Sequence, residues 1–266
     1  MDLFQAILLA IIEGITEFLP ISSTGHMAIA SAFMGINKMP FAKLFMIVIQ
    51  FGAILSVVVL YWKKFLNFKS FYFYVKLFVA ILPAMVFGVF LKDHIETVLE
   101  KPLVIALVLL GGGVVLLFVD KWFTNPNIHT EEEITIKNSL VVGLFQVLAI
   151  VLPGLSRSAA TIIGGMQQKM SRQVAAEFSF YLAVPTMMAA TVKSLYDMHT
   201  DAPELLTFKN VEFLFIGSLV AFVIAILAIR FLISFLQKNG FRFFGWYRIF
   251  VGVILLILIA TGYIQS

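Results

Sequence analysis

The stretch EGITEFLPISSTGH, residues 13–26, places a run of polar side chains directly after the apolar run ILLAII of residues 7–12. Pro20 and Gly25 lie within it, and both residue types interrupt helices. Ionisable groups at membrane depth are costly and are functional by default. If the apolar flanks are embedded in a membrane, this stretch predicts a broken helix that carries functional side chains.

A second stretch, PGLSRSAAT at residues 153–161, has the same character. It brings Arg157 and three hydroxyl side chains into an apolar surrounding. Acids, a histidine, an arginine and several hydroxyls are groups that bind and transfer phosphate. The two stretches together predict a phosphate-handling site.

The composition is that of a membrane protein. Of 266 residues, 61% are hydrophobic, 28 are Phe and only 13% are charged, far from soluble proteins. Cysteine is absent, which excludes disulfides and thiol chemistry. The net charge of +4 is spread along the chain, so we expect no nucleic-acid surface. Asp2 stands where a signal peptide would carry basic residues, and we expect no such peptide.

Six stretches are long and apolar enough to cross a bilayer, which takes roughly 20 residues. They are residues 42–62, 72–92, 101–119, 173–196, 211–237 and 246–264. Residues 2–35 and 139–166 are also apolar, but Pro20 with Gly25 and Pro153 with Gly154 break them. Each arm before the break would form only about 18 to 27 Å of helix, which predicts re-entrant hairpins. The alternative is that the prolines merely kink spanning helices.

The predicted fold class is therefore all-α: a polytopic integral membrane protein with six transmembrane helices and two re-entrant helical hairpins. Similar residues recur in the two halves of the chain at a spacing of 133 positions, a pattern called the echo below. The pairs are Glu13 with Gln146, Leu19-Pro20 with Leu152-Pro153, and Ser23 with Ser156. The echo predicts an inverted repeat within a single membrane domain 1–266, with repeats 1–120 and 138–266 and the acidic residues 131–133 as linker. Paired broken segments point to a site at the repeat interface.

The charged loops predict the orientation in the membrane. The positive-inside rule allows every basic loop to be cytoplasmic. These loops carry Lys63, Lys64, Lys69, Lys121, Lys137, Lys169, Arg172, Lys238, Arg242 and Arg248. The opposite face then holds both termini and the acids Asp93, Glu96, Asp197, Asp201 and Glu204. In this arrangement the first hairpin enters from outside and the second from the cytoplasm.

Glu13 and Glu17 of the first hairpin are four residues apart and share one helix face. Two carboxylates this close repel each other in a low dielectric. One of them is then protonated, which suits a general acid or base, or a divalent cation lies between them. Mg²⁺ and Ca²⁺ fit ligands that are all oxygen. The alternative is that both side chains only satisfy backbone groups at the break.

The residues after Pro20 have open roles. Ser22, Ser23, Thr24 and Gly25 can contact phosphate, or the hydroxyls can satisfy freed backbone groups. His26 can move a proton near neutral pH or serve only as a structural histidine. The other histidines, His94, His129 and His199, fall in predicted loops.

Arg157 is the strongest candidate in the second hairpin. Its planar fork matches phosphate oxygens, and it cannot lose its charge in the membrane. Gly154, Ser156 and Ser158 lie at a helix start, where free N–H groups and the helix dipole favour an anion. A purely structural pairing of Arg157 with Glu13 or Glu17 is the alternative.

The motifs EGITEFLPISSTGH and PGLSRSAAT closely resemble the two signature motifs of the undecaprenyl-diphosphatase family, also called the bacitracin-resistance protein. The resemblance extends through VIQFG at residues 48–52 and AEFSF at residues 176–180. It implies a membrane enzyme that removes the terminal phosphate of undecaprenyl diphosphate and so recycles the lipid carrier of peptidoglycan synthesis. It also implies a divalent cation and a site at the outer face of the bacterial cytoplasmic membrane.

The residues expected to act on the substrate follow from both arguments. Those expected in catalysis are Glu13, Glu17, Ser23, His26 and Arg157, with Glu13 and Glu17 as metal ligands. Those expected in substrate binding are Ser22, Thr24, Gly25, Gln50, Gly154, Ser156, Ser158 and Thr161. Ser23 as nucleophile, with a Glu taking its proton, and a water activated by a Glu both stay open.

Two positions depart from the family pattern. Ala159 replaces a usual glycine, and Met46 stands where an acid is frequent, so no metal or proton role is carried over to position 46. The rival hypothesis is a transporter or flippase, because broken helices in inverted repeats are typical of transporters. Acid-phosphatase-like lipid phosphatases are disfavoured, since their motifs are missing. We expect the bilayer and the lipid diphosphate as partners, with a homodimer as a further expectation.

Overall fold

The computed structural model describes residues 1–91 and 101–264. Within that part, six helices are long and apolar enough to cross a membrane. They are α3 (Pro40–Leu60), α5 (Phe71–Phe90), α7 (Pro102–Trp122), α10 (Arg172–Asp201), α11 (Phe208–Asn239) and α12 (Arg242–Ala260). Each coincides with one of the stretches expected to span, so the six predicted spans are confirmed. The predicted positions Asp93, His94 and Glu96 lie outside the described residues.

Four shorter helices form the two broken segments. They are α1 (Leu3–Thr16), α2 (Ser23–Phe33), α8 (Ile136–Val151) and α9 (Arg157–Gln167). The 14 residues of α1 extend over only about 21 Å, less than the roughly 30 Å of the hydrocarbon core. Non-helical residues separate the arms at both prolines. A single kinked helix is therefore excluded, and the helix–break–helix prediction is confirmed.

A serine ends each break and caps the N-terminus of the next helix. The Oγ atoms of Ser22 and Ser156 accept hydrogen bonds from the N–H groups of Gly25 and Ala159, both at 3.3 Å. Both serines adopt positive φ angles, 70° and 74°, which non-glycine residues rarely do. Ser23 and Arg157 are consequently the first residues of α2 and α9.

The caps shift the sequence echo by one residue. Ser156 is the structural counterpart of Ser22 rather than of Ser23, because one more residue separates it from the preceding proline. In the second break Gly154, with φ at 93°, directly follows that proline. A Cβ atom at Gly154 would lie 2.8 Å from the backbone oxygen of Ile105. Glycine is therefore needed there for both its conformation and its closeness to α7.

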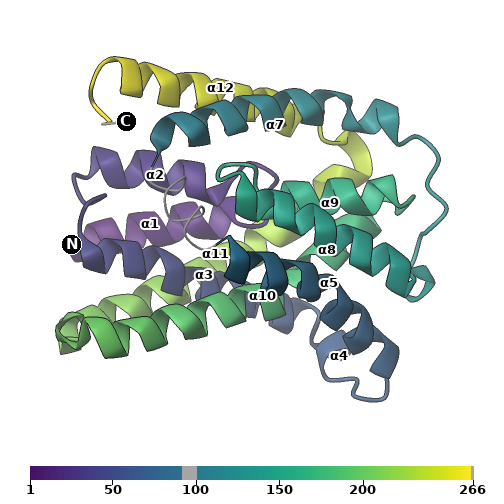
Figure 1. The fold of residues 1–266 in the computed structure, drawn as a ribbon, viewed down its shortest axis with the longest axis horizontal. Coiled ribbons are helices and arrows are strands. Elements are labelled where there is room, and N and C mark those ends of the chain that lie inside the picture. Colours follow the sequence, from purple (N-terminus) through teal and green to yellow (C-terminus); the bar gives the residue numbers. More distant parts are fainter. Residues whose placement is uncertain (92–100, 265–266) are drawn as a thin grey trace.

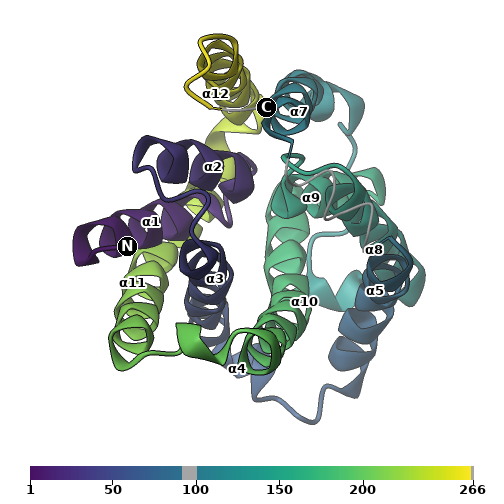
Figure 2. The ribbon, with the colours of Figure 1, turned by 60° about the vertical axis from the view of Figure 1, so that its left-hand side comes forward.

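The hairpins pack across the predicted halves of the chain. The α1 helix packs on α11 and α8 packs on α5, while α7 and α12 lie side by side (Figures 1 and 2). Gly113 and Gly245 let α7 and α12 approach closely, since a Cβ at either would lie within 2.9 Å of the other's carbonyl oxygen. The division into inverted repeats 1–120 and 138–266 stays a prediction.

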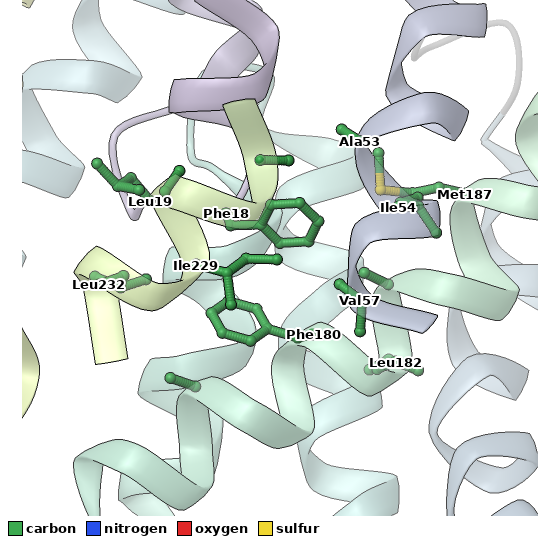
Figure 3. Packing of buried hydrophobic residues seen from close by; sticks show 14 of the residues in the cluster. Phe18, Leu19, Ala53, Ile54, Val57, Phe180, Leu182, Met187, Ile229 and Leu232 are labelled. Atoms are coloured by element: carbon green, nitrogen blue, oxygen red, sulfur yellow. The ribbon is translucent and has the colours of Figure 1, made fainter. Parts of the chain in front are cut away.

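Apolar side chains anchor the first break inside the molecule. Phe18 is fully buried, and its ring meets that of Phe180 edge to face, with centroids 5.3 Å apart. Figure 3 shows these two rings with Ile229 of α11 and Val57 of α3. The residue after Glu17 is thus fixed by packing, which restricts where the Glu17 carboxylate can lie.

The basic loops meet at one end of the molecule. The linker turn η1 (Glu131–Glu133) pairs with Lys64 of α4 (Trp62–Phe65) through Glu131 and Glu132. At the start of α10, Arg172 Nε binds Asp120 Oδ1 at 2.6 Å, and the same carboxylate accepts the N–H of residue 241. This clustering agrees with loops on one membrane face.

One basic residue was placed wrongly. Arg248, expected in a cytoplasmic loop, lies within α12 and is fully buried. The helix begins at Arg242, earlier than expected, because the aromatic sequence RFFGWY continues the apolar span on its N-terminal side. Arg248 therefore points into the protein and not into a loop.

Candidate active site

A cavity of about 190 Å³ lies between the two breaks. Its wall contains eight of the residues expected to act on the substrate: Glu17, Ser22, Ser23, Thr24, Gln50, Gly154, Ser156 and Arg157. The remaining lining residues are Ala149, Pro153, Thr186 and Met187. The structure thus brings the two predicted motifs together around one space.

Glu17 connects the two hairpins at this cavity. Its Oε1 accepts a hydrogen bond from Arg157 Nη2 at 2.8 Å, and its Oε2 accepts one from Ser23 Oγ at 2.7 Å. Glu17 is 7% exposed, so the ion pair is shielded from water and screened little by salt. A hydroxyl bonded to a buried carboxylate has the geometry of a nucleophile and its base.

Arg157 is held from the α10 side. Its Nη1 donates to the Ser179 carbonyl at 3.0 Å, and Nη2 also contacts Met187 Sδ at 3.6 Å. Its Nε has no partner among the described residues. Glu17 and Ser179 therefore fix the plane of the guanidinium beside the cavity.

Glu13 is fully buried behind Glu17 and does not line the cavity. Both of its carboxyl oxygens lack a hydrogen-bond partner within the part of the chain that the structure describes. Its charged neighbours are Glu17 and Arg157. A buried acid with two unpartnered oxygens next to a second acid is a place for a proton or a cation.

His26 does not line the cavity either. Its Nδ1 lies 2.8 Å from the Ser22 carbonyl, and its Nε2 lies 2.9 Å from the Tyr247 hydroxyl. Because a carbonyl only accepts, Nδ1 carries the proton and, in the neutral ring, Nε2 accepts from Tyr247. This arrangement holds the peptide after the strained Ser22.

Three further predicted binding residues lie next to the cavity rather than in its wall. Ser158 donates to the Leu19 carbonyl at 2.9 Å and so ties one break to the other. Thr161 bonds the Ser179 hydroxyl at 2.6 Å. Gly25 packs against Leu109, since a Cβ atom at position 25 would lie 2.8 Å from Leu109 Cδ1. His129 is exposed in a loop, as predicted. The loop prediction for His199 is wrong, because α10 continues to Asp201 and includes this exposed histidine.

Comparison with known sequences shows which protein family this chain resembles. The family described as "Bacitracin resistance protein BacA" matches residues 6–254. The chain belongs to this bacitracin resistance protein family. It is 58% identical over 259 residues to the undecaprenyl-diphosphatase of Flavobacterium johnsoniae, covering 97% of this chain and 96% of the relative.

Other relatives carry the same name. The undecaprenyl-diphosphatase of Porphyromonas gingivalis is 47% identical over 278 residues, with 98% of each chain covered. That of Bdellovibrio bacteriovorus is 48% identical over 265 residues, with 99% of this chain and 98% of the relative covered. The family match over residues 6–254 includes both breaks and begins within α1 and ends within α12.

In this member of the bacitracin resistance protein family, α10 also contributes to the site, which the sequence did not predict. Thr186 and Met187 line the cavity, and Ser179 orients Arg157. The only available signal for Ser179 was its place in the AEFSF stretch. Tyr247 was missed as well, because 221 residues separate it from its partner His26.

Replacing Tyr247 by Phe removes the hydroxyl group that donates a hydrogen bond to His26 Nε2. We expect a loss of about 1 kcal/mol of stability and a several-fold lower kcat/KM for the family's reaction, since Ser22 is held less firmly. Thermal unfolding in detergent and initial rates measure both effects. Tyr263→Phe, which changes an exposed tyrosine, is the control. Wild-type values for Tyr247→Phe would refute the contribution of the His26 contact.

Proposed function

We propose that this chain is an undecaprenyl-diphosphatase, which hydrolyses undecaprenyl diphosphate to undecaprenyl phosphate and inorganic phosphate. The observation that carries the proposal is the contact of Glu17 with both Ser23 and Arg157 in one cavity. The relatives' name supplies the substrate. A carboxylate, a hydroxyl and a cation converging on one space favour chemistry over transport.

Ser23 is the proposed nucleophile. Glu17 accepts the Ser23 proton as Oγ attacks the terminal phosphorus, and the bond from that phosphorus to the bridging oxygen breaks, releasing undecaprenyl phosphate. Glu17 passes this proton to the departing undecaprenyl phosphate and is again a carboxylate. It then deprotonates a water molecule that attacks the phosphorus of the phosphoserine. The bond from that phosphorus to Ser23 Oγ breaks, inorganic phosphate leaves, and Glu17 returns the proton to Ser23 Oγ.

Arg157 and the start of α9 stabilise charge during both steps. A guanidinium matches two phosphate oxygens at once, and the N-terminus of a helix favours an anion. These groups are fixed before substrate binds, so little reorganisation is needed as negative charge develops. Thr24 and Gln50, which also line the cavity, are the proposed polar contacts to the outer phosphate oxygens.

The donor set fits a divalent cation. The unpartnered Glu13 oxygens, together with Glu17, present the oxygen ligands that Mg²⁺ and Ca²⁺ prefer, and a diphosphate would add more. Within the described residues, no group of three or more His, Cys, Asp or Glu side chains forms a closed metal site, so the substrate is needed to complete it. A bound cation would neutralise diphosphate charge.

Chelation with EDTA is expected to abolish phosphate release, and added Mg²⁺ or Ca²⁺ to restore it. Glu13→Gln should raise the cation concentration for half-maximal rate by about 10-fold, because a ligand charge is lost. Calorimetric titration of the cation, with a non-hydrolysable diphosphate present, gives a second readout. Full activity in EDTA would show that the reaction needs no cation, and the proposed contribution of Ser23 would be unaffected.

The setting in the cell follows from the same proposal. The protein lies in the bacterial cytoplasmic membrane, with the cavity open to the outer side, and recycles the lipid carrier for peptidoglycan synthesis. Bacitracin resistance follows from removal of the diphosphate form. A homodimer stays a prediction, and no role for nucleic acid is proposed.

The products test the function directly. Purified protein in detergent, given undecaprenyl diphosphate, should yield undecaprenyl phosphate and inorganic phosphate in equal amounts, measured by mass spectrometry and phosphate assay. Unchanged substrate in the presence of folded protein and both cations would contradict the proposal. It would favour a transporter that binds the lipid without cleaving it.

A further inference from the structure

Arg248 is a buried cation that only backbone groups satisfy within the described part of the chain. It is fully buried, and its five hydrogen bonds all go to carbonyl oxygens. The acceptors are Val108 and Leu109 of α7, Pro20 of the first break, and Gly154 and Leu155 of the second. A guanidinium without a carboxylate partner is costly to bury, so a contribution beyond simple packing is expected.

Three of these acceptors lie in the two breaks. Nη1 donates to Leu155 at 2.7 Å and to Pro20 at 3.3 Å, and Nη2 donates to Gly154 at 3.0 Å. One planar group thus bonds both broken segments at once. Its fork shape suits several carbonyls in fixed directions, whereas an ammonium acts as a point charge.

The bond to Leu155 acts on Ser156, the N-cap residue of α9. A trans peptide is planar and directs its N–H opposite to its C=O. Because the Leu155 carbonyl points at Arg248, the N–H of Ser156 points away from it. Ser156 lines the cavity with φ at 74°, a strained conformation that persists only when its surroundings fix it. Arg157 is the next residue.

The chain keeps space for this guanidinium. A Cβ atom at Gly112 of α7 would lie 2.3 Å from Arg248 Nη2 and 2.9 Å from its Cζ. Any side chain at position 112 would therefore displace the guanidinium. At the adjacent Gly111 nothing lies within 4 Å, so the requirement is local.

We propose that Arg248 is a positioning residue that fixes the two breaks relative to each other and thereby orients Ser156 and Arg157 toward the diphosphate. It acts through the backbone and does not touch substrate. The inference rests on the proposed phosphatase function. Loss of Arg248 should weaken both substrate binding and turnover.

The first test replaces Arg248 by Met and by Lys. For Arg248→Met we expect kcat/KM to fall about 100-fold, which is the effect that a small misplacement of binding groups can have. Part of this fall should be a rise in KM. Arg248→Lys should recover only part, because its ammonium cannot reach all the carbonyls. Arg242→Met, an exposed arginine on the same helix, is the matched control and should match wild type.

The second test keeps Arg248 in the chain but displaces its guanidinium by a substitution at position 112. Gly112→Ala should raise KM and lower kcat, whereas Gly111→Ala should leave both unchanged. The rise in KM is decisive, since an unfolded fraction lowers apparent kcat without altering the KM of the folded enzyme. Unchanged KM in both Gly112→Ala and Arg248→Lys would overturn the inference. Inactive wild-type protein would instead refute the proposed function.

Discussion

Replacing Arg157 by Ala is expected to lower kcat/KM for phosphate release on the order of 10³-fold, the size of effect seen when a preorganised charge-stabilising donor is removed. The guanidinium contacts Glu17 at 2.8 Å and Ser179 at 3.0 Å, so its position is fixed from both sides. Its loss removes the main positive charge at the cavity wall and leaves the buried Glu17 without its cation.

Arg157→Lys separates charge from geometry. Lysine keeps the charge but cannot donate to Glu17, Ser179 and phosphate in one plane, and we expect it to lose on the order of 10²-fold. Arg230→Ala, which removes an exposed arginine from α11, is the control for loss of a helix cation. Wild-type rates for Arg157→Lys would show that the fork geometry is not used.

Replacing Ser23 by Ala is expected to lower kcat on the order of 10⁴-fold, since removing a nucleophile that works as a unit with its base eliminates the covalent route. The Glu17–Arg157 pair does not depend on the Ser23 hydroxyl, so the cavity should stay formed and KM should change little. Rapid-quench assays with labelled diphosphate measure the rate and look for phosphoserine.

Ser31→Ala is the matched control for this change. Ser31 is buried on the same helix, and its Oγ donates to the Ala28 carbonyl at 3.3 Å, away from the cavity. Its rate should equal that of wild type. A loss of only about tenfold in Ser23→Ala would show that Ser23 is a phosphate contact and that water activated by a Glu attacks directly.

The sequence predicted the parts of the fold that depend on local composition. Long apolar runs gave the six spans, and Pro20 and Pro153 marked the breaks because proline cannot continue a helix. The acids and Arg157 stood out because ionisable groups are rare in such surroundings. These signals lie within a few residues of each other and need no knowledge of packing.

Arg248 shows what local signals cannot supply. Near the end of a span, a basic residue is typical of a loop, and only the carbonyl groups of three distant segments make it an interior residue. The space for it is provided by Gly112, which in sequence is one of three consecutive glycines in an apolar helix. The His26–Tyr247 contact was invisible for the same reason.

The site also refines the predicted contribution of each acid. The spacing of Glu13 and Glu17 gave a shared helix face, but not the difference between them. Glu17 reaches the cavity and has both oxygens bonded, whereas Glu13 is buried behind it with neither bonded. Phe18, the next residue, is fully buried against Phe180, and this packing restricts where the Glu17 carboxylate can lie.

Phosphate release from undecaprenyl diphosphate should therefore need one residue from each break. We expect steady release by purified wild-type protein and large losses in Ser23→Ala and Arg157→Ala, one from each hairpin, when all are measured side by side. The controls Ser31→Ala and Arg230→Ala should match wild type. Full activity in Ser23→Ala or in Arg157→Ala, with the protein folded, would show that the two breaks do not build one phosphatase site.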